Sequence, residues 1–146
     1  MGIALSCNRK CRTVSLSQTA LIDYIITQFS LLDEHPITIP MNPGLRLSHP
    51  TTAPMPTKQL SLFRLPYHSL VGSLMYIALG TRPDIAYAVQ QLCHYLNCYR
   101  TIHLEAAKHV VCYLKGTFTL MLTLGGDHAA RLLRHTDSDF TACVDT

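Results

Sequence analysis

Proline is distributed unevenly along this chain, and its distribution limits the possible folds more than any other feature. Seven of the eight prolines lie between Pro36 and Pro66. Proline lacks a backbone N–H and biases the preceding residue towards an extended conformation, so this stretch cannot form a long helix or an inner strand. We therefore expect a linker over residues 36–66, with a short edge strand at Ile37–Ile39. Such a long linker is unusual inside a compact domain, which predicts two lobes whose mutual position depends on other contacts.

The residues before this linker predict a β-hairpin followed by a helix. Strands over Gly2–Cys7 and Arg12–Leu16 would be joined by the polar turn Asn8–Cys11, and polar and apolar residues alternate in the second strand. This alternation predicts a hairpin with one buried face. Ser17 would cap a helix of about three turns. Its expected apolar stripe has helical spacing and consists of Leu21, Tyr24, Ile25 and Phe29.

The residues after the linker predict three packed helices. We expect a first helix over Tyr67–Leu79, with Gly80 as a left-handed cap, and a second over Pro83–Asn97 that starts with its proline. A third, over Thr101–Gly116, would be capped by its threonine and ended by its glycine. The residues expected to face inward are Leu70, Leu74, Ile77, Ala78, Ile85, Val89, Leu92, Leu96, Ala107, Val110, Val111 and Leu114.

Beyond Gly116 the pattern is typical of strands. Thr119–Leu124 and Arg131–Phe140 would form a hairpin around the turn Gly125–Asp127. The outer edge of such a hairpin has no partner, so we expect it to be a surface for self-association. The whole pattern predicts an α+β fold: an N-terminal hairpin with one helix, a linker, a three-helix lobe and a C-terminal hairpin.

The composition is compatible with a folded core and with a polyanionic partner, and the sequence indicates neither a membrane-spanning segment nor secretion. Of the 146 residues 48% are hydrophobic and 14% charged, with a net charge of +3. No apolar run approaches the roughly 20 residues that span a bilayer, and no secretory signal is visible. We therefore expect a cytoplasmic or nuclear protein with its six cysteines reduced. A zinc site at Cys93, Cys98, His103 and His109 is a weak alternative, because the two cysteines lie in a helical pattern.

Four basic residues of the helical region are the candidate nucleic-acid contacts: Arg82, Arg100, Lys108 and Lys115. They would follow a phosphate backbone if they shared one face, whereas the alternative is that they are simply solvated. Arg82 is the most suggestive, because it lies in a turn that would hold its guanidinium in a fixed place. Capping the carbonyls of the preceding helix is an equally good use for it.

Catalytic signals are weak. Asp137 and Asp139 lie at the end of a predicted strand, where carboxylates commonly hold a divalent metal. Their spacing places them on opposite faces of a regular strand, so they would not share one ion without a bend. The other carboxylates are scattered, and no phosphate-binding loop or nucleophile motif is present.

One string is far more specific than these patterns. The sequence LVGSLMYIALGTRPDIAYAV at Leu70–Val89 closely resembles the signature segment of copia-type LTR retrotransposon Pol polyproteins. Gly2–Ile3 with Thr13–Gln18 resembles the hairpin that closes the reverse transcriptase palm in this family, and Ile39–Met41 the stretch after the thumb helix. Further along, Ala106–Lys108 with Tyr113–Thr117 resembles the next family helix, and Thr136–Phe140 the first ribonuclease H strand.

The resemblance implies a domain organisation. Residues 1–35 would be the end of the palm and the thumb helix, 36–66 the linker, 67–117 a helical connection lobe, and 118–146 a truncated start of a ribonuclease H-like domain. The family's Tyr-x-Asp-Asp motif lies upstream of the first hairpin, and Asp137 resembles the first of several ribonuclease H aspartates. His68, Leu104, Ala142 and Cys143 stand where the family commonly has arginine, tryptophan and a Gly-Asp pair.

These observations predict a fragment of a Mg²⁺-dependent reverse transcriptase and ribonuclease H polyprotein that is inactive and binds no cofactor alone. Asp137 would be a vestige of a metal site. Its expected partners are RNA/DNA hybrid or single-stranded nucleic acid. The alternative is a small nucleic-acid-binding or strand-donating interaction protein derived from such a polyprotein.

Overall fold

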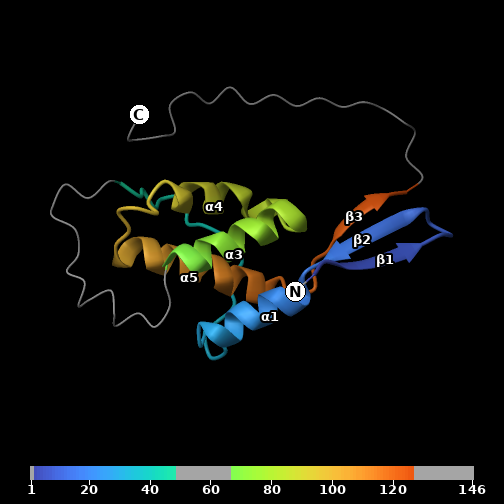
Figure 1. Ribbon diagram of the computed structural model, residues 1–146, viewed down its shortest axis with the longest axis horizontal. Helices are drawn as coiled ribbons and strands as arrows, with labels where there is room; N and C mark the ends of the chain where they lie inside the picture. The colour runs from blue at the N-terminus through green and yellow to red at the C-terminus, as the bar shows by residue number, and fades with distance from the viewer. Residues whose placement is uncertain (1, 49–66, 127–146) are drawn as a thin grey trace, which may run out of the picture.

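The computed structural model of the chain describes residues 2–48 and 67–126, and it is mixed α and β, as expected (Figure 1). A layer of helices forms the body, and a three-stranded antiparallel sheet extends from one end of it. The elements in chain order are β1 (Ala4–Asn8), β2 (Thr13–Ser17), α1 (Thr19–Gln28), α3 (Tyr67–Gly80), the 3₁₀ turn η1 (Pro83–Ile85), α4 (Ala86–Cys93), α5 (Thr101–Gly116) and β3 (Leu122–Gly125).

One hydrophobic core joins the helices on both sides of the proline-rich segment. Helix α1 packs against α5, and α3 packs against α4. Each fully buried leucine or isoleucine in this core contributes roughly 1.5–3 kcal/mol of transfer free energy. The helices on either side of the linker are therefore held together in the described residues by contacts other than the linker itself, between α1 and α5. The face of α1 that packs inward also differs from the expected one, because Tyr24 is 47% exposed; the buried residues are Leu21, Ile22, Ile25 and Ile26.

Helix α3 lies at the centre of this core and begins at Tyr67, as predicted. It includes Gly80, which is not among the glycines with positive φ, so the predicted left-handed cap is wrong. A different constraint favours glycine there. A Cβ at Gly80 would lie 2.6 Å from the side-chain oxygen of Gln18, so this buried glutamine side chain would have to shift if residue 80 carried a side chain.

The next two helices follow the prediction with small shifts. Pro83 begins η1, and α4 ends at Cys93, earlier than expected. Helix α5 ends at Gly116, as predicted. Its N-cap is Arg100 in place of the expected Thr101, and the Arg100 backbone N–H donates to Nδ1 of His103 at 2.9 Å.

The sheet has the order β1-β2-β3, so a strand from the end of the described chain completes the N-terminal hairpin. Val14 pairs with Leu124 and Leu16 with Leu122. The first strand of the expected C-terminal hairpin thus belongs to the N-terminal sheet, and its expected partner at 131–140 lies outside the described residues. The short strand expected at Ile37–Ile39 is absent, because the Ile37 N–H donates to the carbonyl of Cys112 on α5.

Polar and apolar side chains alternate between the two faces of the hairpin, but the predicted buried face is not formed. Every residue of β1 is exposed, and those of β2 are only half-buried. The central strand therefore has neighbours along its edges but no covering layer within the described residues.

Candidate nucleic-acid interface

Arg82, the most suggestive of the four predicted contacts, lies inside the protein. Its side chain is 2% exposed. Nε and Nη2 donate to the two carboxylate oxygens of Asp84 at 3.0 and 2.7 Å, a bidentate ion pair. Nη1 donates to the carbonyl of Thr117 at 3.0 Å, and Nη2 also donates to its hydroxyl at 2.6 Å. The guanidinium therefore holds the end of α5, and not the end of the preceding helix α3.

Tyr113 completes this cluster. Its hydroxyl donates to Oδ2 of Asp84 at 2.8 Å, and its ring lies under the guanidinium, with 5.6 Å between Cζ of Arg82 and the ring centroid. Burial of the Asp84 carboxyl favours its neutral form, but the hydrogen bonds from Arg82 and Tyr113 and the charge of Arg82 outweigh this and lower its pKa. Burial, together with the bond to Asp84, raises the pKa of Tyr113. The cluster is a charge-balanced structural clamp that joins η1 to α5.

Lys115 has a comparable internal task. Its ammonium donates to the carbonyls of Leu31, Leu32 and Glu34, at 3.3 Å to the first and 2.7 Å to the last. These carbonyls belong to the loop that follows α1. The lysine thus uses its three donors to fix that loop against α5.

Arg100 and Lys108 are half-buried on α5, and both interact with other groups of the protein. Arg100 is the N-cap of the helix, and Lys108 lies two turns further along. The structure therefore does not bring the four predicted cations together as one open basic face. Two of them, Arg82 and Lys115, hold the fold itself.

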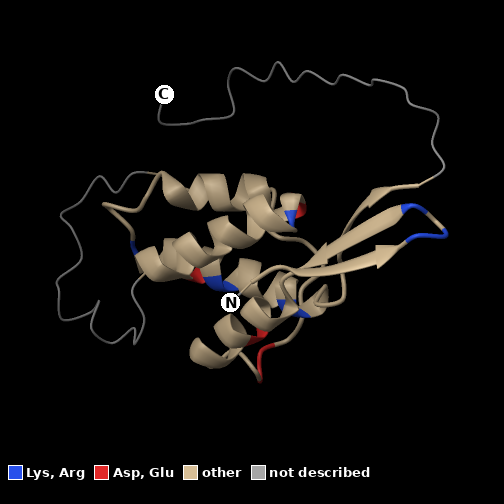
Figure 2. Cartoon of the chain, turned by 45° about the vertical axis from the view of Figure 1, so that its right-hand side comes forward, with Lys and Arg blue, Asp and Glu red and all other residues tan. Residues whose placement is uncertain are grey.

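An exposed basic cluster lies elsewhere, at the tip of the hairpin. Arg9, Lys10 and Arg12 surround the turn between β1 and β2, and all three are exposed (Figure 2). Oδ1 of Asn8 accepts the backbone N–H groups of Lys10 and Cys11 at 3.1 and 3.2 Å, which shapes the turn. Sequence reasoning treated these residues only as a polar turn. The available signal was three basic side chains among the four residues 9–12.

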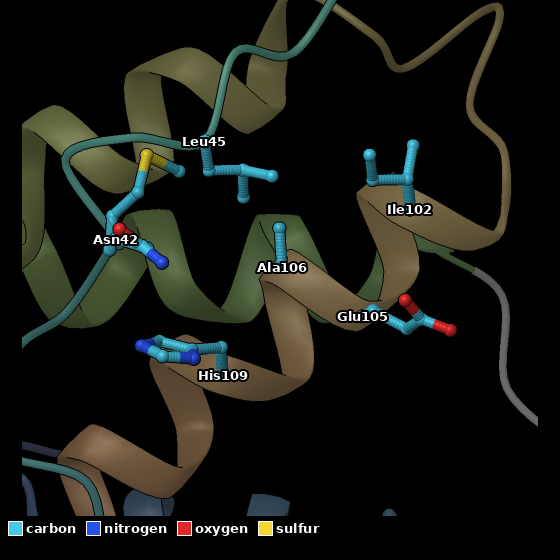
Figure 3. Close-up of a pocket in the computed structure, with 7 residues that line it drawn as sticks. Asn42, Leu45, Ile102, Glu105, Ala106 and His109 are labelled. Atoms are coloured by element: carbon cyan, nitrogen blue, oxygen red, sulfur yellow. The ribbon is translucent and has the colours of Figure 1, made fainter.

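A pocket of about 210 Å³ lies between α5 and the segment 41–45, which crosses this helix (Figure 3). Apolar side chains form most of its wall, and His109 is held at one side by a 3.1 Å contact between Nε2 and the carbonyl of Ile39. Glu105 lies at its rim and would repel a phosphate. Its lining residues are Met41, Asn42, Leu45, Ile102, Glu105, Ala106 and His109.

The predicted metal residue, Asp137, lies outside the described residues, as does Asp139. Within residues 2–48 and 67–126, no group of three or more histidine, cysteine, aspartate or glutamate side chains is arranged to hold a metal ion, and this includes the set Cys93, Cys98, His103 and His109. None of the helices in the same ranges is long and apolar enough to cross a membrane.

Comparison with known proteins identifies relatives over nearly the whole chain. It is 32% identical over 99% of its length to the retrovirus-related Pol polyprotein from transposon TNT 1-94 of Nicotiana tabacum. Two Arabidopsis thaliana polyproteins of the same description, from transposons RE1 and RE2, are 33% and 30% identical over 89% and 98% of the chain. The chain is a homologue of part of the retrovirus-related Pol polyproteins of copia-type transposons.

This Pol-type chain corresponds to only a small part of those relatives: 11%, 8% and 9% of their lengths, respectively. No family model matches it, and no solved structure matches it. The resemblance inferred from Leu70–Val89 is thus confirmed at the level of the polyprotein family.

Proposed function

We propose that the chain is a fragment of the reverse transcriptase and ribonuclease H part of a copia-type Pol polyprotein, and that it is catalytically inactive alone. The observation that carries this proposal is similarity to Pol polyproteins over 99% of the chain. In the intact parent, this part would serve RNA-directed DNA synthesis. Residues 1–35 are assigned to the end of the palm and the thumb helix, 36–66 to the linker and 67–117 to the connection lobe.

The pairing of β3 with β2 favours one change to the domain boundaries. Leu122–Gly125 shares a sheet with the hairpin assigned to the palm. We therefore place the start of the ribonuclease H-like part after Gly125, and not at residue 118. Asp137 keeps its place as a candidate vestige of the first metal-binding aspartate.

The inactivity proposal has a chemical basis. Mg²⁺-dependent phosphoryl transfer needs several oxygen ligands around each ion. The residues of the described core do not fit such an ion. Asp84 is already held by Arg82 and Tyr113, and no group of three or more histidine, cysteine, aspartate or glutamate side chains in the described ranges is arranged to hold a metal. The clamp at Arg82 instead supports a role in positioning helices.

The test is a pair of activity assays on the purified chain with Mg²⁺: primer extension on an RNA template, and cleavage of the RNA strand of an RNA/DNA hybrid. An intact copia-type polyprotein serves as the positive control. We expect no product above background from the chain alone in either assay. Mg²⁺-dependent turnover that copurifies with the folded chain would contradict the proposal.

A second candidate function, nucleic-acid binding, is favoured by the exposed hairpin tip. Arg9 and Lys10 are exposed residues of the turn between β1 and β2, and this end of the hairpin lies away from the helices (Figure 2). Two such cations can each neutralise a phosphate and release counterions, so binding through them should weaken as salt is raised. This proposal moves the expected contact from Arg82, Arg100, Lys108 and Lys115 to the tip.

Fluorescence-polarisation titration of RNA/DNA hybrid and of single strands, at low and near-physiological salt, tests this. Changing Arg9 and Lys10 together to serine should lower the salt slope by about 1.5. Arg46→Ser is the matched control, because Arg46 is also exposed but lies in the segment after α1. Equal effects of both changes, or no binding at low salt, would contradict a specific role for the tip.

A further inference from the structure

The outer edge of β1 is an accessible row of backbone groups. Strand β1 has β2 on one side, and no described strand lies on its other side. All five of its residues are exposed, and the sheet extends beyond the helical body, so nothing in the body of helices shields this edge (Figure 1). Half of the N–H and C=O groups of an edge strand lack a ladder partner, which makes such an edge a template for another strand.

This edge also lacks the features that usually prevent strand addition. Ala4–Asn8 contains no charged residue and no proline. The register with β2 runs through five successive pairs, from Ala4↔Ser17 to Asn8↔Thr13, without a bulge. Natural edge strands are commonly protected by lysine, proline or bulges. None of these interrupts β1.

The two faces of the sheet differ sharply in polarity. Because side chains alternate along a strand, the register defines which residues share a face. On one face, the cross-strand rows are Leu5–Leu16–Leu122 and Cys7–Val14–Leu124. On the other lie Ser6, Ser15 and Thr123, of which the last two are joined by a 2.9 Å hydroxyl bond. The apolar face ends at β1 with Leu5, which is 67% exposed.

We propose that β1 pairs antiparallel with β1 of a second copy of this chain, about a two-fold axis at Leu5. This inference stands apart from the proposed function and needs neither catalysis nor nucleic acid. Its basis is that a two-fold edge contact is self-complementary: each strand offers the other the same row of donors and acceptors. The product is one six-stranded sheet with a continuous apolar face, in which the exposed Leu5 side chains of the two copies cover each other.

Side-chain matching selects the register. With Leu5 opposite the partner's Leu5, Ile3 faces the partner's Cys7, so the apolar side chains of the leucine face meet one another. On the other face, the small Ala4 meets the small polar side chain of the partner's Ser6. Centring the axis on Ser6 would place Ile3 opposite the partner's Arg9. Centring it on Cys7 would place Leu5 there. Cross-strand pairs of like character stabilise a sheet, so the register at Leu5 is favoured.

Because the contact between the two strands is small, we expect the dimer to be weak. A single pair of short strands buries less than the roughly 1,200 Å² of stable complexes, so the dimer should have a dissociation constant of about 1 μM to 1 mM. Sedimentation velocity of the full chain across this range of concentrations should show a monomer that converts to a discrete dimer. A monomer at every concentration would overturn the proposal.

Leu5→Lys is the decisive variant, because it places two ammonium groups opposite each other on the axis. We expect the dimer to weaken at least about tenfold. Leu79→Lys is the matched control: Leu79 is 82% exposed and belongs to α3, not to the edge of the sheet, so the same chemical change there should leave the dimer intact. Both positions are exposed, and circular dichroism verifies that both variants fold. Equal weakening by both, or large aggregates insensitive to Leu5→Lys, would refute pairing at this edge.

A disulfide readout tests the register. In a Cys7→Ser, Cys11→Ser background, Leu5→Cys should give an intermolecular disulfide on mild oxidation, because the two residue-5 side chains face each other. Leu79→Cys in the same background should give none above that of the background itself. Equal yields from both positions would contradict an axis at Leu5.

Discussion

The hydroxyl of Thr81 donates a 2.9 Å hydrogen bond to Oε1 of Gln18, although the two residues are 63 positions apart. Gln18 precedes α1, and Thr81 follows α3; both are 2% exposed. The bond joins the place where the sheet becomes a helix to the end of the central helix. Because both groups are buried, leaving either without its partner would cost about 1–3 kcal/mol.

The contact between Gln18 and Gly80 gives the first prediction. Gly80→Ala should destabilise the fold by about 1–2 kcal/mol, because its Cβ would lie 2.6 Å from the amide oxygen of Gln18. In a Gln18→Ala background, the same change should become neutral or stabilising, since alanine is the better helix former. Urea unfolding of the four members of this cycle measures the coupling. Gly72→Ala, where a Cβ meets nothing within 4 Å, is the control and should not destabilise.

The Arg82–Asp84 pair predicts acid sensitivity. The pKa of Asp84 is lowered in the folded protein, so its stabilising contribution is complete above the unfolded pKa of about 3.9 and is lost as pH falls through the folded value. Asp84→Asn should cost about 1–2 kcal/mol near pH 7, a figure discounted for the 35% exposure of this side chain. Its stability should also fall less than that of the wild type below about pH 4. Parallel pH curves for the two proteins would contradict this.

Lys115 gives a third prediction. Lys115→Met keeps most of the aliphatic stem but removes the ammonium that holds the carbonyls of Leu31, Leu32 and Glu34. We expect a loss of about 1–2 kcal/mol and faster amide hydrogen exchange after α1. Lys108→Met, on the same helix, is the comparison, and a loss as large as that of Lys115→Met would argue against the loop contact.

The fourth prediction concerns the join between β2 and β3. Gly125 has a φ of +93°, and a Cβ there would lie 2.2 Å from the carbonyl oxygen of Arg12. Gly125→Ala should therefore release the end of β3 while leaving the helical core intact. Hydrogen exchange should accelerate at Thr13–Leu16 and stay unchanged in α3. Unchanged protection of β2 would show that the strand tolerates the side chain.

Local patterns predicted the helices well because their causes are local. The spacing of Leu70, Leu74 and Ile77 and the position of Pro83 defined α3 and the start of η1 without any knowledge of neighbours. The errors came where a distant residue decides. A Cβ at residue 80 would meet the side chain of Gln18, and Ile37 bonds to α5 in place of joining a strand.

The candidate site was harder to predict. Arg82 was correctly placed in a turn, but its burial depends on Asp84, Tyr113 and Thr117, and the last two lie about 30 positions away or more. The local sequence therefore could not predict that Arg82 holds η1 and α5 together inside the protein. The exposed tip could have been found from the charge of residues 9–12, but a polar turn is also what any hairpin needs.

Ser15 and Thr123 are joined by a hydrogen bond although they lie 108 positions apart, so the sheet joins segments that the ribosome synthesises at different times. A ribosome releases β1 and β2 long before β3, and two strands alone are only marginally stable in water. The sheet can therefore close only after the helices of the described residues have been synthesised. Closure of a loop of this length slows folding. During translation, the edge of β2 that later pairs with β3 is therefore exposed to chaperones and to neighbouring nascent chains.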